Sequence, residues 1–157
     1  MAKSIEMILA EMSLRVRLLM SAENAGKRIG GLSERETLLL ELIGTKKGMC
    51  ISEIAEFFGG VSSSTISMTI TKLWRKHKLV KKNIMPKNQR VTLVSLTDKG
   101  KLLLAEIKKD QLMIYKTVTE SLGLAPEQDE NLRKLLNNSI RFFDKQLGLN
   151  KRNAHCK

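Results

Sequence analysis

Eight basic residues and no carboxylate lie between Glu56 and Asp98, so this stretch is the part of the sequence best suited to bind an anion. The eight are Lys72, Arg75, Lys76, Lys78, Lys81, Lys82, Lys87 and Arg90. Ammonium and guanidinium groups make charge-assisted hydrogen bonds to phosphate. The whole chain has 28 basic and 16 acidic residues, a net charge of +12, and this segment alone carries +8 of it. The pattern indicates a polyanion such as nucleic acid or an anionic membrane surface as partner, although a charge run alone can also be a solvated face.

The first half of the basic segment falls on two predicted helices. Ser52 is expected to begin a short helix that ends at Gly59 and Gly60, and Ser62 is expected to cap a second helix over 63–77. In that second helix the apolar residues recur at i, i+4 and i+7, which predicts one buried face. Polar and basic residues occupy the opposite face. The two helices and their turn predict a helix-turn-helix.

The second half of the basic segment predicts a β-hairpin. The runs "LVKKNIM" and "RVTLVSL" are rich in β-branched and apolar residues, and the bend "PKNQ" separates them. Thr97 and Asp98 then begin a long helix that is expected to reach about Leu122. The hairpin tip is basic because Lys87 and Arg90 flank the bend.

Further helices flank this central unit. Apolar residues spaced by three and four predict a helix over 5–22, and Ser33 with Glu36 forms a capping box that opens another. Pro126 suits the first turn of a last helix, at about 127–147. The fold class is therefore mostly α with a small β-hairpin (α+β), a winged helix-turn-helix between N- and C-terminal helices.

Three stretches of this sequence resemble the MarR family of winged-helix transcription regulators. "ISEIAEFFGGVSSSTISMTITKLWRKHKLVKK" is similar to the family's helix-turn-helix, "PKNQR" to its wing tip, and "VSLTDKG" to the stretch that opens the helix after the wing. The wing has Asn88-Gln89-Arg90 where the family usually carries Asp-x-Arg. The resemblance implies four segments: 1–30 for dimerisation, 31–98 for DNA binding, 99–150 for dimerisation again, and 151–157 as a tail.

The second helix and the hairpin tip are predicted to bind double-stranded DNA. The helix N-terminus would hold phosphate, the outer face would read base edges in the major groove, and Arg90 would enter a minor groove. The predicted DNA-binding residues are Ser62, Ser63, Ser64, Thr65, Ser67, Met68, Thr71, Lys72, Arg75, Lys76, Lys87, Asn88, Gln89 and Arg90.

The flanking helices hold more apolar residues than a winged helix needs to cover. As the resemblance implies, these residues are expected to form a homodimer that binds a palindromic operator, with half-sites about 10 bp apart. A repressor released by a small-molecule effector would fit this arrangement. The predicted dimerisation residues are Ile5, Leu9, Met12, Val16, Tyr115, Val118, Leu122, Leu135, Ile140, Phe142, Phe143 and Leu147.

No stretch of the sequence carries the pattern of a catalytic, cofactor or metal site. Phosphate-loop, nucleophile-elbow and zinc-protease patterns are absent, and the two histidines lie far apart. We therefore expect no enzyme, no cofactor and no metal. The N-terminus does not read as a signal peptide, which favours the cytoplasm and reduced thiols at Cys50 and Cys156.

Two other functions stay open on the sequence. A winged-helix module could bind protein or nucleic acid without operator selectivity, and competition between one palindrome and bulk DNA would distinguish it from a regulator. A thiol or metal sensor would need Cys50 or the pair His155-Cys156, although a buried inert thiol is the more ordinary reading of Cys50.

Overall fold

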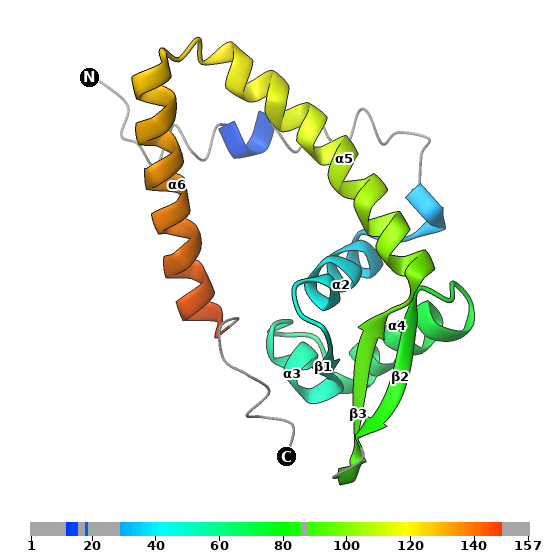
Figure 1. Cartoon of the computed structure of the whole chain (residues 1–157). Coiled ribbons are helices and arrows are strands. Elements are labelled where there is room, and N and C mark those ends of the chain that lie inside the picture. Colours follow the sequence, from blue (N-terminus) through cyan, green and yellow to red (C-terminus); the bar gives the residue numbers. More distant parts are fainter. Residues whose placement is uncertain (1–11, 16–17, 19–28, 86–87, 149–157) are drawn as a thin grey trace.

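The computed structural model describes residues 12–15, 18, 29–85 and 88–148 of the 157. Its elements follow the predicted order, from a 3₁₀ turn η1 (Ile29–Gly31) through to α6, as Figure 1 shows. Residues 12–15 and 18 are helical, while the rest of the predicted helix 5–22 lies outside the described residues. Within the described part of the chain, no helix is long and apolar enough to cross a membrane.

The capping box predicted at Ser33 opens α2 (Glu34–Gly44). The Ser33 hydroxyl accepts the backbone N–H of Glu36 at 3.3 Å, and the Glu36 carboxylate accepts the backbone N–H of Ser33 at 2.7 Å. Two of the otherwise unpaired donors at the helix start are satisfied in this way. Leu39, Leu40 and Ile43 face inward from α2 and are fully buried.

A three-stranded antiparallel sheet forms the wing and its base. Its strand order is β1 (Met49–Cys50), β3 (Asn88–Leu96), β2 (Val80–Met85). The predicted hairpin is confirmed, with Val80 opposite Leu96 and an irregularity between Ile84 and Met85 near the tip. The short apolar run at Met49 and Cys50, which precedes the helix-turn-helix, forms the third strand by pairing with β3.

The first helix of the helix-turn-helix, α3 (Ile51–Glu56), begins earlier than predicted. Cys50, not Ser52, occupies the N-cap position, and the Ser52 hydroxyl lies 3.3 Å from the Cys50 sulfur rather than on a backbone N–H. The strand therefore passes directly into the helix. The expectation of a reduced thiol at Cys50 is also wrong, because Cys50 is disulfide-bonded in this structure.

The second helix, α4 (Ser63–Arg75), packs its predicted apolar face into the core. Ile66, Ile70 and Leu73 are fully buried, together with Val80 and Val94 of the sheet. The helix ends two residues before the predicted His77. Lys78 adopts a left-handed φ of 57°, and the next N–H, of Leu79, donates to the Leu73 carbonyl at 2.9 Å. This closure takes the place of the glycine with which such helices often end.

The long helix α5 (Asp98–Ser121) is fixed to the wing at its first turn. The Thr97 hydroxyl accepts the N–H of Gly100 at 3.0 Å and donates to the Lys78 carbonyl at 2.8 Å. Gly100 approaches β2 so closely that a Cβ there would lie 2.0 Å from the Leu79 carbonyl oxygen. The Thr-x-x-Gly spacing is therefore a packing requirement.

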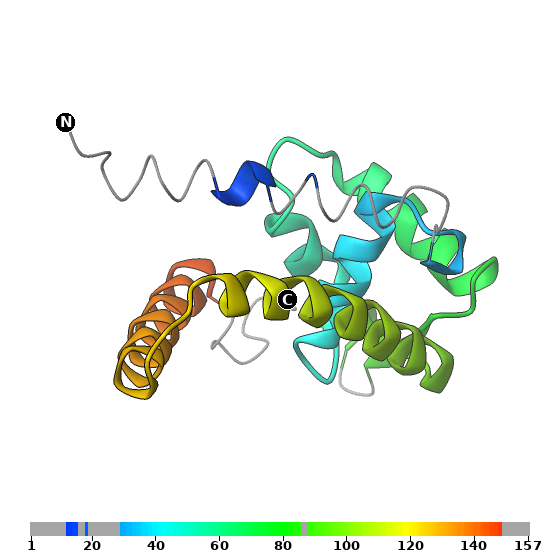
Figure 2. The ribbon, with the colours of Figure 1, turned by 90° about the horizontal axis from the view of Figure 1, so that it is seen from above.

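The two C-terminal helices extend away from the winged unit. Figures 1 and 2 show α5 leaving the central body and α6 (Pro126–Leu147) standing apart from it. Pro126 begins α6 as predicted, and no residue of α6 is buried. Among the described residues, the buried apolar side chains therefore lie between η1 and β3 and in the first half of α5. Ile114, in the second half of α5, is the exception.

Candidate nucleic-acid interface

The N-terminus of α4 presents a group of hydroxyls to solvent. Ser62 caps the helix by accepting the backbone N–H of Thr65 at 3.2 Å, and its hydroxyl lies 2.8 Å from that of Thr65 and 3.0 Å from that of Ser64. Ser62, Ser63 and Ser64 are exposed and Thr65 is half-buried. The free N–H groups and the positive end of the helix dipole at this position favour an anion.

The outer face of α4 carries the predicted reading residues at different depths. Met68 is 67 % exposed, which leaves its thioether available to an apolar group such as a thymine methyl. Ser67 and Thr71 are half-buried, whereas Lys72, Arg75 and Lys76 are exposed. The predicted DNA-binding residues of α4 therefore all lie outside the buried face at Ile66, and they differ in how much of each side chain is exposed.

Lys72 is held by a carboxylate from another helix. Its ammonium lies 2.6 Å from the Glu36 carboxylate, whose side chain is only 3 % exposed while that of Lys72 is 46 % exposed. Burial raises the pKa of Glu36, but hydrogen bonds from Lys72 and from Ser33 outweigh it and lower the pKa to about 2. The carboxylate is therefore ionised at neutral pH, and the pair ties α4 to the start of α2.

The wing tip carries Arg90 in an exposed position. The side-chain oxygen of Asn88 accepts the backbone N–H of Arg90 at 3.2 Å, which orders the strand at this point. The asparagine side chain can thus accept the same backbone N–H that an aspartate at this position could accept, and it adds no negative charge beside Arg90. Asn88 and Gln89 are exposed as well, and Lys87 lies outside the described residues.

Lys82 is a basic residue of this surface that the sequence prediction missed. Its ammonium donates to the Thr71 hydroxyl at 3.0 Å and lies 5.0 Å from the centre of the Trp74 ring. The Arg75 guanidinium lies 5.1 Å from the same ring centre. Trp74 meets β2 through the Lys82 side chain, and it keeps 37 % of its surface exposed. Because side chains alternate between the two faces of a strand, the sequence could have suggested that Lys82 shares a face with Val80. It could not have shown which helix packs against that face.

The cations of this surface are almost uncompensated. Among the described residues, Lys72 is the one basic residue of the 57–97 segment that pairs with a carboxylate. The described residues also contain no group of three or more potential metal ligands. The arrangement can bind an extended anion by charge and hydrogen bonding.

The predicted dimerisation residues that the structure describes are largely exposed. On α6, Leu135, Ile140 and Phe143 show 64, 56 and 58 % of their surface, and Phe142 meets Phe143 edge to face with ring centres 5.7 Å apart. Met12, Tyr115, Leu122, Phe142 and Leu147 are exposed too, and Val118 is half-buried. Ile5, Leu9 and Val16 lie outside the described residues.

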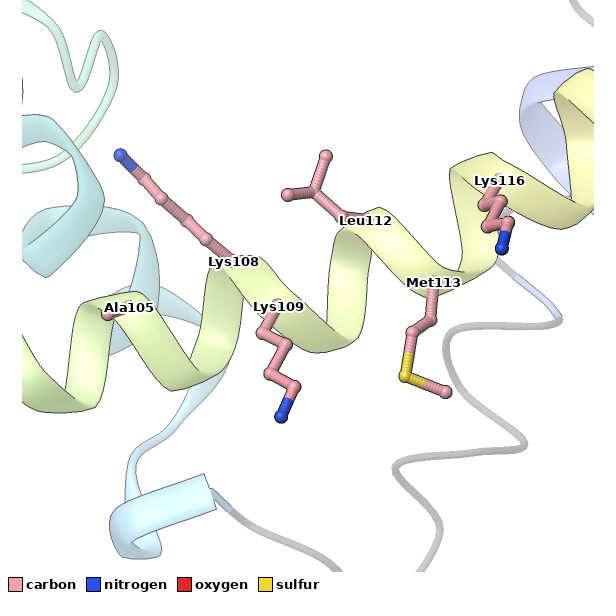
Figure 3. Close-up of a pocket in the computed structure, with 6 residues that line it drawn as sticks. All are labelled: Ala105, Lys108, Lys109, Leu112, Met113 and Lys116. Atoms are coloured by element: carbon pink, nitrogen blue, oxygen red, sulfur yellow. The ribbon is translucent and has the colours of Figure 1, made fainter.

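A shallow groove runs along α5. Its lining comes from α5 alone: Ala105, Lys108, Lys109, Leu112, Met113 and Lys116. Figure 3 shows Lys108 and Leu112 projecting to one side of the helix and Lys109 and Met113 to the other. A groove on the surface of one helix does not enclose a small molecule, so the binding of a small-molecule effector stays a prediction.

Residues 32–100 match the family model of the winged helix DNA-binding domain. The central part of the chain therefore has the winged-helix fold and is similar over these residues to a winged helix DNA-binding domain. No curated protein sequence gives a significant match to the chain.

Solved structures with the same fold extend the comparison to the flanking helices. FabT of Streptococcus pneumoniae in complex with DNA has a TM-score of 0.67 at 20% identity, covering 90% of this chain and 96% of FabT. A MarR structure has a TM-score of 0.66 at 18% identity, covering 93% of this chain and 95% of that MarR chain. A MepR variant from S. aureus has a TM-score of 0.67 at 16% identity, covering 91% of this chain and 99% of MepR. The resemblance to the MarR family is confirmed at the level of the fold.

Proposed function

We propose that this protein is a MarR-type transcription regulator that binds a palindromic site in double-stranded DNA as a homodimer. The observation that carries the proposal is the joint surface of α4 and the wing. Exposed hydroxyls cap α4, Arg90 stands on the wing, and all described basic residues of the 57–97 segment except Lys72 lack a carboxylate partner. A helix of this width enters the major groove while the wing reaches the adjacent backbone or minor groove.

The dimer is proposed from the apolar surface of α5 and α6. An isolated helix such as α6 buries nothing of its own, yet it exposes large side chains along one face, among them Leu136, Ile140 and Phe143. Water contact of that area is unfavourable by about 25 cal/mol per Å², so a second copy that covers it stabilises the fold. The N-terminal segment 1–30 and the C-terminal segment 99–150 are assigned to this role.

Selection of bound duplexes from a random library, followed by fluorescence anisotropy, tests the DNA-binding part. A regulator should prefer one palindrome over bulk DNA by about 10³-fold or more, and the affinity should fall steeply with salt. Equal affinity for all duplexes would instead identify a module without operator selectivity. A flat salt response would contradict phosphate binding altogether.

Sedimentation equilibrium tests the dimer independently of DNA. Ile140→Glu places a charge on the apolar face of α6 and should yield monomers. Arg141→Glu introduces the same carboxylate on the polar side of the helix, away from these apolar side chains, and should leave the dimer intact. A wild-type chain that is monomeric at micromolar concentration would refute the assembly, whatever its affinity for DNA.

The regulatory part of the proposal is that the protein represses transcription and that a small molecule releases it. This part is proposed from the resemblance to the MarR family, and the groove on α5 that includes Lys108 and Leu112 is the surface to which an effector could bind once a second copy covers it. An operator-reporter fusion in cells with and without the gene tests the sign of regulation. Lower expression in the absence of the protein would contradict repression.

A further inference from the structure

The cluster around Trp74 joins the recognition helix to the wing. Thr71, Trp74 and Arg75 are at i, i+3 and i+4 of α4 and therefore share a face, and Lys82 reaches them from β2. Three contacts define the cluster: Lys82 to the Thr71 hydroxyl at 3.0 Å, and both cations about 5 Å from the centre of one ring. It is the one place in the described chain where two cations lie over a single aromatic ring.

Two positive charges lie about 5 Å from the centre of one ring here, without a carboxylate partner in the described chain. Neither Arg75 nor Lys82 forms an ion pair with any described carboxylate, and the sequence offers no acid between Glu56 and Asp98. Burial and the charge of Arg75 both lower the pKa of Lys82, so its ammonium form is less favoured here than in an isolated, exposed lysine. An incoming anion would remove that penalty. The ring contributes cation–π attraction, which fixes the cations without neutralising them.

We infer that Thr71, Arg75 and Lys82, arranged around Trp74, hold one phosphate of the DNA backbone. The inference rests on the proposed DNA-binding function and adds a contact that the sequence did not predict. Arg75 presents a planar fork of donors, Lys82 a point charge, and the Thr71 hydroxyl can donate once Lys82 turns to the phosphate. A phosphate held between α4 and β2 fixes the angle at which the helix enters the groove relative to the wing, because phosphate contacts set register and orientation.

Salt-dependent anisotropy with matched variants tests the inference. Each phosphate contact contributes about 0.9 to the slope of log affinity against log salt, so Lys82→Gln should lower the slope by nearly 1 and weaken binding roughly tenfold. Lys81→Gln removes the same charge from the neighbouring, exposed residue of β2 and should change the slope much less. Equal slopes for the two variants would overturn the inference. Thr71→Val, which keeps the shape of the side chain, should weaken binding in the same direction as Lys82→Gln.

Trp74 is the only tryptophan of the chain, so its fluorescence reports on this cluster directly. Titration with the selected duplex should change the emission with the dissociation constant seen by anisotropy, and Lys82→Gln should reduce the change. An emission that stays constant while the DNA binds would place the phosphate elsewhere. Inorganic phosphate at constant ionic strength should give no saturable change, and a saturable one would assign the cluster to a free anion instead.

Failure of the cluster and failure of the proposed function give different results. If the wild-type protein binds no duplex, the DNA-binding function itself is wrong. If it binds duplexes with a steep salt response but Lys82→Gln behaves like Lys81→Gln, only the phosphate site is wrong. Melting temperatures of all variants, measured without DNA, separate a lost contact from a lost fold.

Discussion

Replacement of Glu36 by glutamine tests how strongly the Glu36–Lys72 pair stabilises the winged unit. The carboxyl has an ordinary pKa of 4.5 in the unfolded chain and about 2 in the fold. One pKa unit corresponds to about 1.4 kcal/mol, so the ionised carboxylate contributes on the order of 3 kcal/mol to the free energy of unfolding. The pair joins a side chain that is almost fully buried to one that is about half exposed, so solvent screening removes only part of this contribution.

The sign of the pH dependence follows from the direction of the shift. A carboxyl whose folded pKa is depressed stabilises the protein above its unfolded pKa, and the stabilisation is lost as the pH falls through the folded value. For Glu36 the loss should occur between pH 4.5 and about 2. Glu36→Gln removes the ionisable group, so the variant should be less stable at neutral pH and should show a smaller loss across this range.

Urea denaturation followed by circular dichroism, at one fixed protein concentration and several pH values, measures the effect. Glu34→Gln is the matched control, because Glu34 is exposed in the same first turn of α2 and forms no ion pair with a described residue. The control should follow the wild type at every pH. If Glu36→Gln also follows it, the pair does not stabilise the fold and the reasoning from burial and hydrogen bonds is refuted.

Three further substitutions have expected outcomes that follow from single contacts. Arg90→Ala should weaken operator binding roughly tenfold in an anisotropy titration, while Gln89→Ala should change it less; unchanged affinity for Arg90→Ala would exclude the wing contact. Gly100→Ala should lower the free energy of unfolding by about 2–3 kcal/mol, because its Cβ would meet the Leu79 carbonyl, whereas Gly59→Ala, which faces open space, should be nearly neutral. Lys78→Gly should raise the melting temperature, since it relieves a left-handed φ of 57° worth about 1 kcal/mol, and a lower value would contradict this account.

Local signals account for the parts of the fold that the sequence predicted. The capping interactions at Ser33, Ser62 and Thr97 each span three residues, so their hydrogen bonds can be inferred from a short stretch of sequence. The same holds for the apolar spacing of α4 and for the hairpin. At Ser52 the local rule failed, because pairing of Met49 and Cys50 with β3 decides where the strand ends and the helix begins.

Contacts between distant segments account for what the sequence did not predict. Glu36 and Lys72 are 36 positions apart, and their pairing depends on how α2 crosses α4. Lys82 reaches Trp74 only through the register that sets Val80 against Leu96. Neither the way α2 crosses α4 nor the register of β2 against β3 can be inferred from the spacing of charged or apolar residues. The basic segment therefore predicted an overall positive charge, but not which partner each lysine or arginine contacts.

Two consecutive residues of α4, Thr71 and Lys72, make different contacts, and this explains how the helix can be held in place and still be available to a ligand. Lys72 is neutralised by a buried carboxylate, so it holds α4 against α2 and adds little attraction for DNA. Thr71, one position earlier, meets a lysine that has no carboxylate partner in the described chain. Because salt screens a partly buried ion pair much less than it screens exposed cations, ionic strength should weaken DNA binding more than it loosens the packing of α4. If α4 binds DNA as proposed, the stability of this helix and its attraction for phosphate depend on different charges.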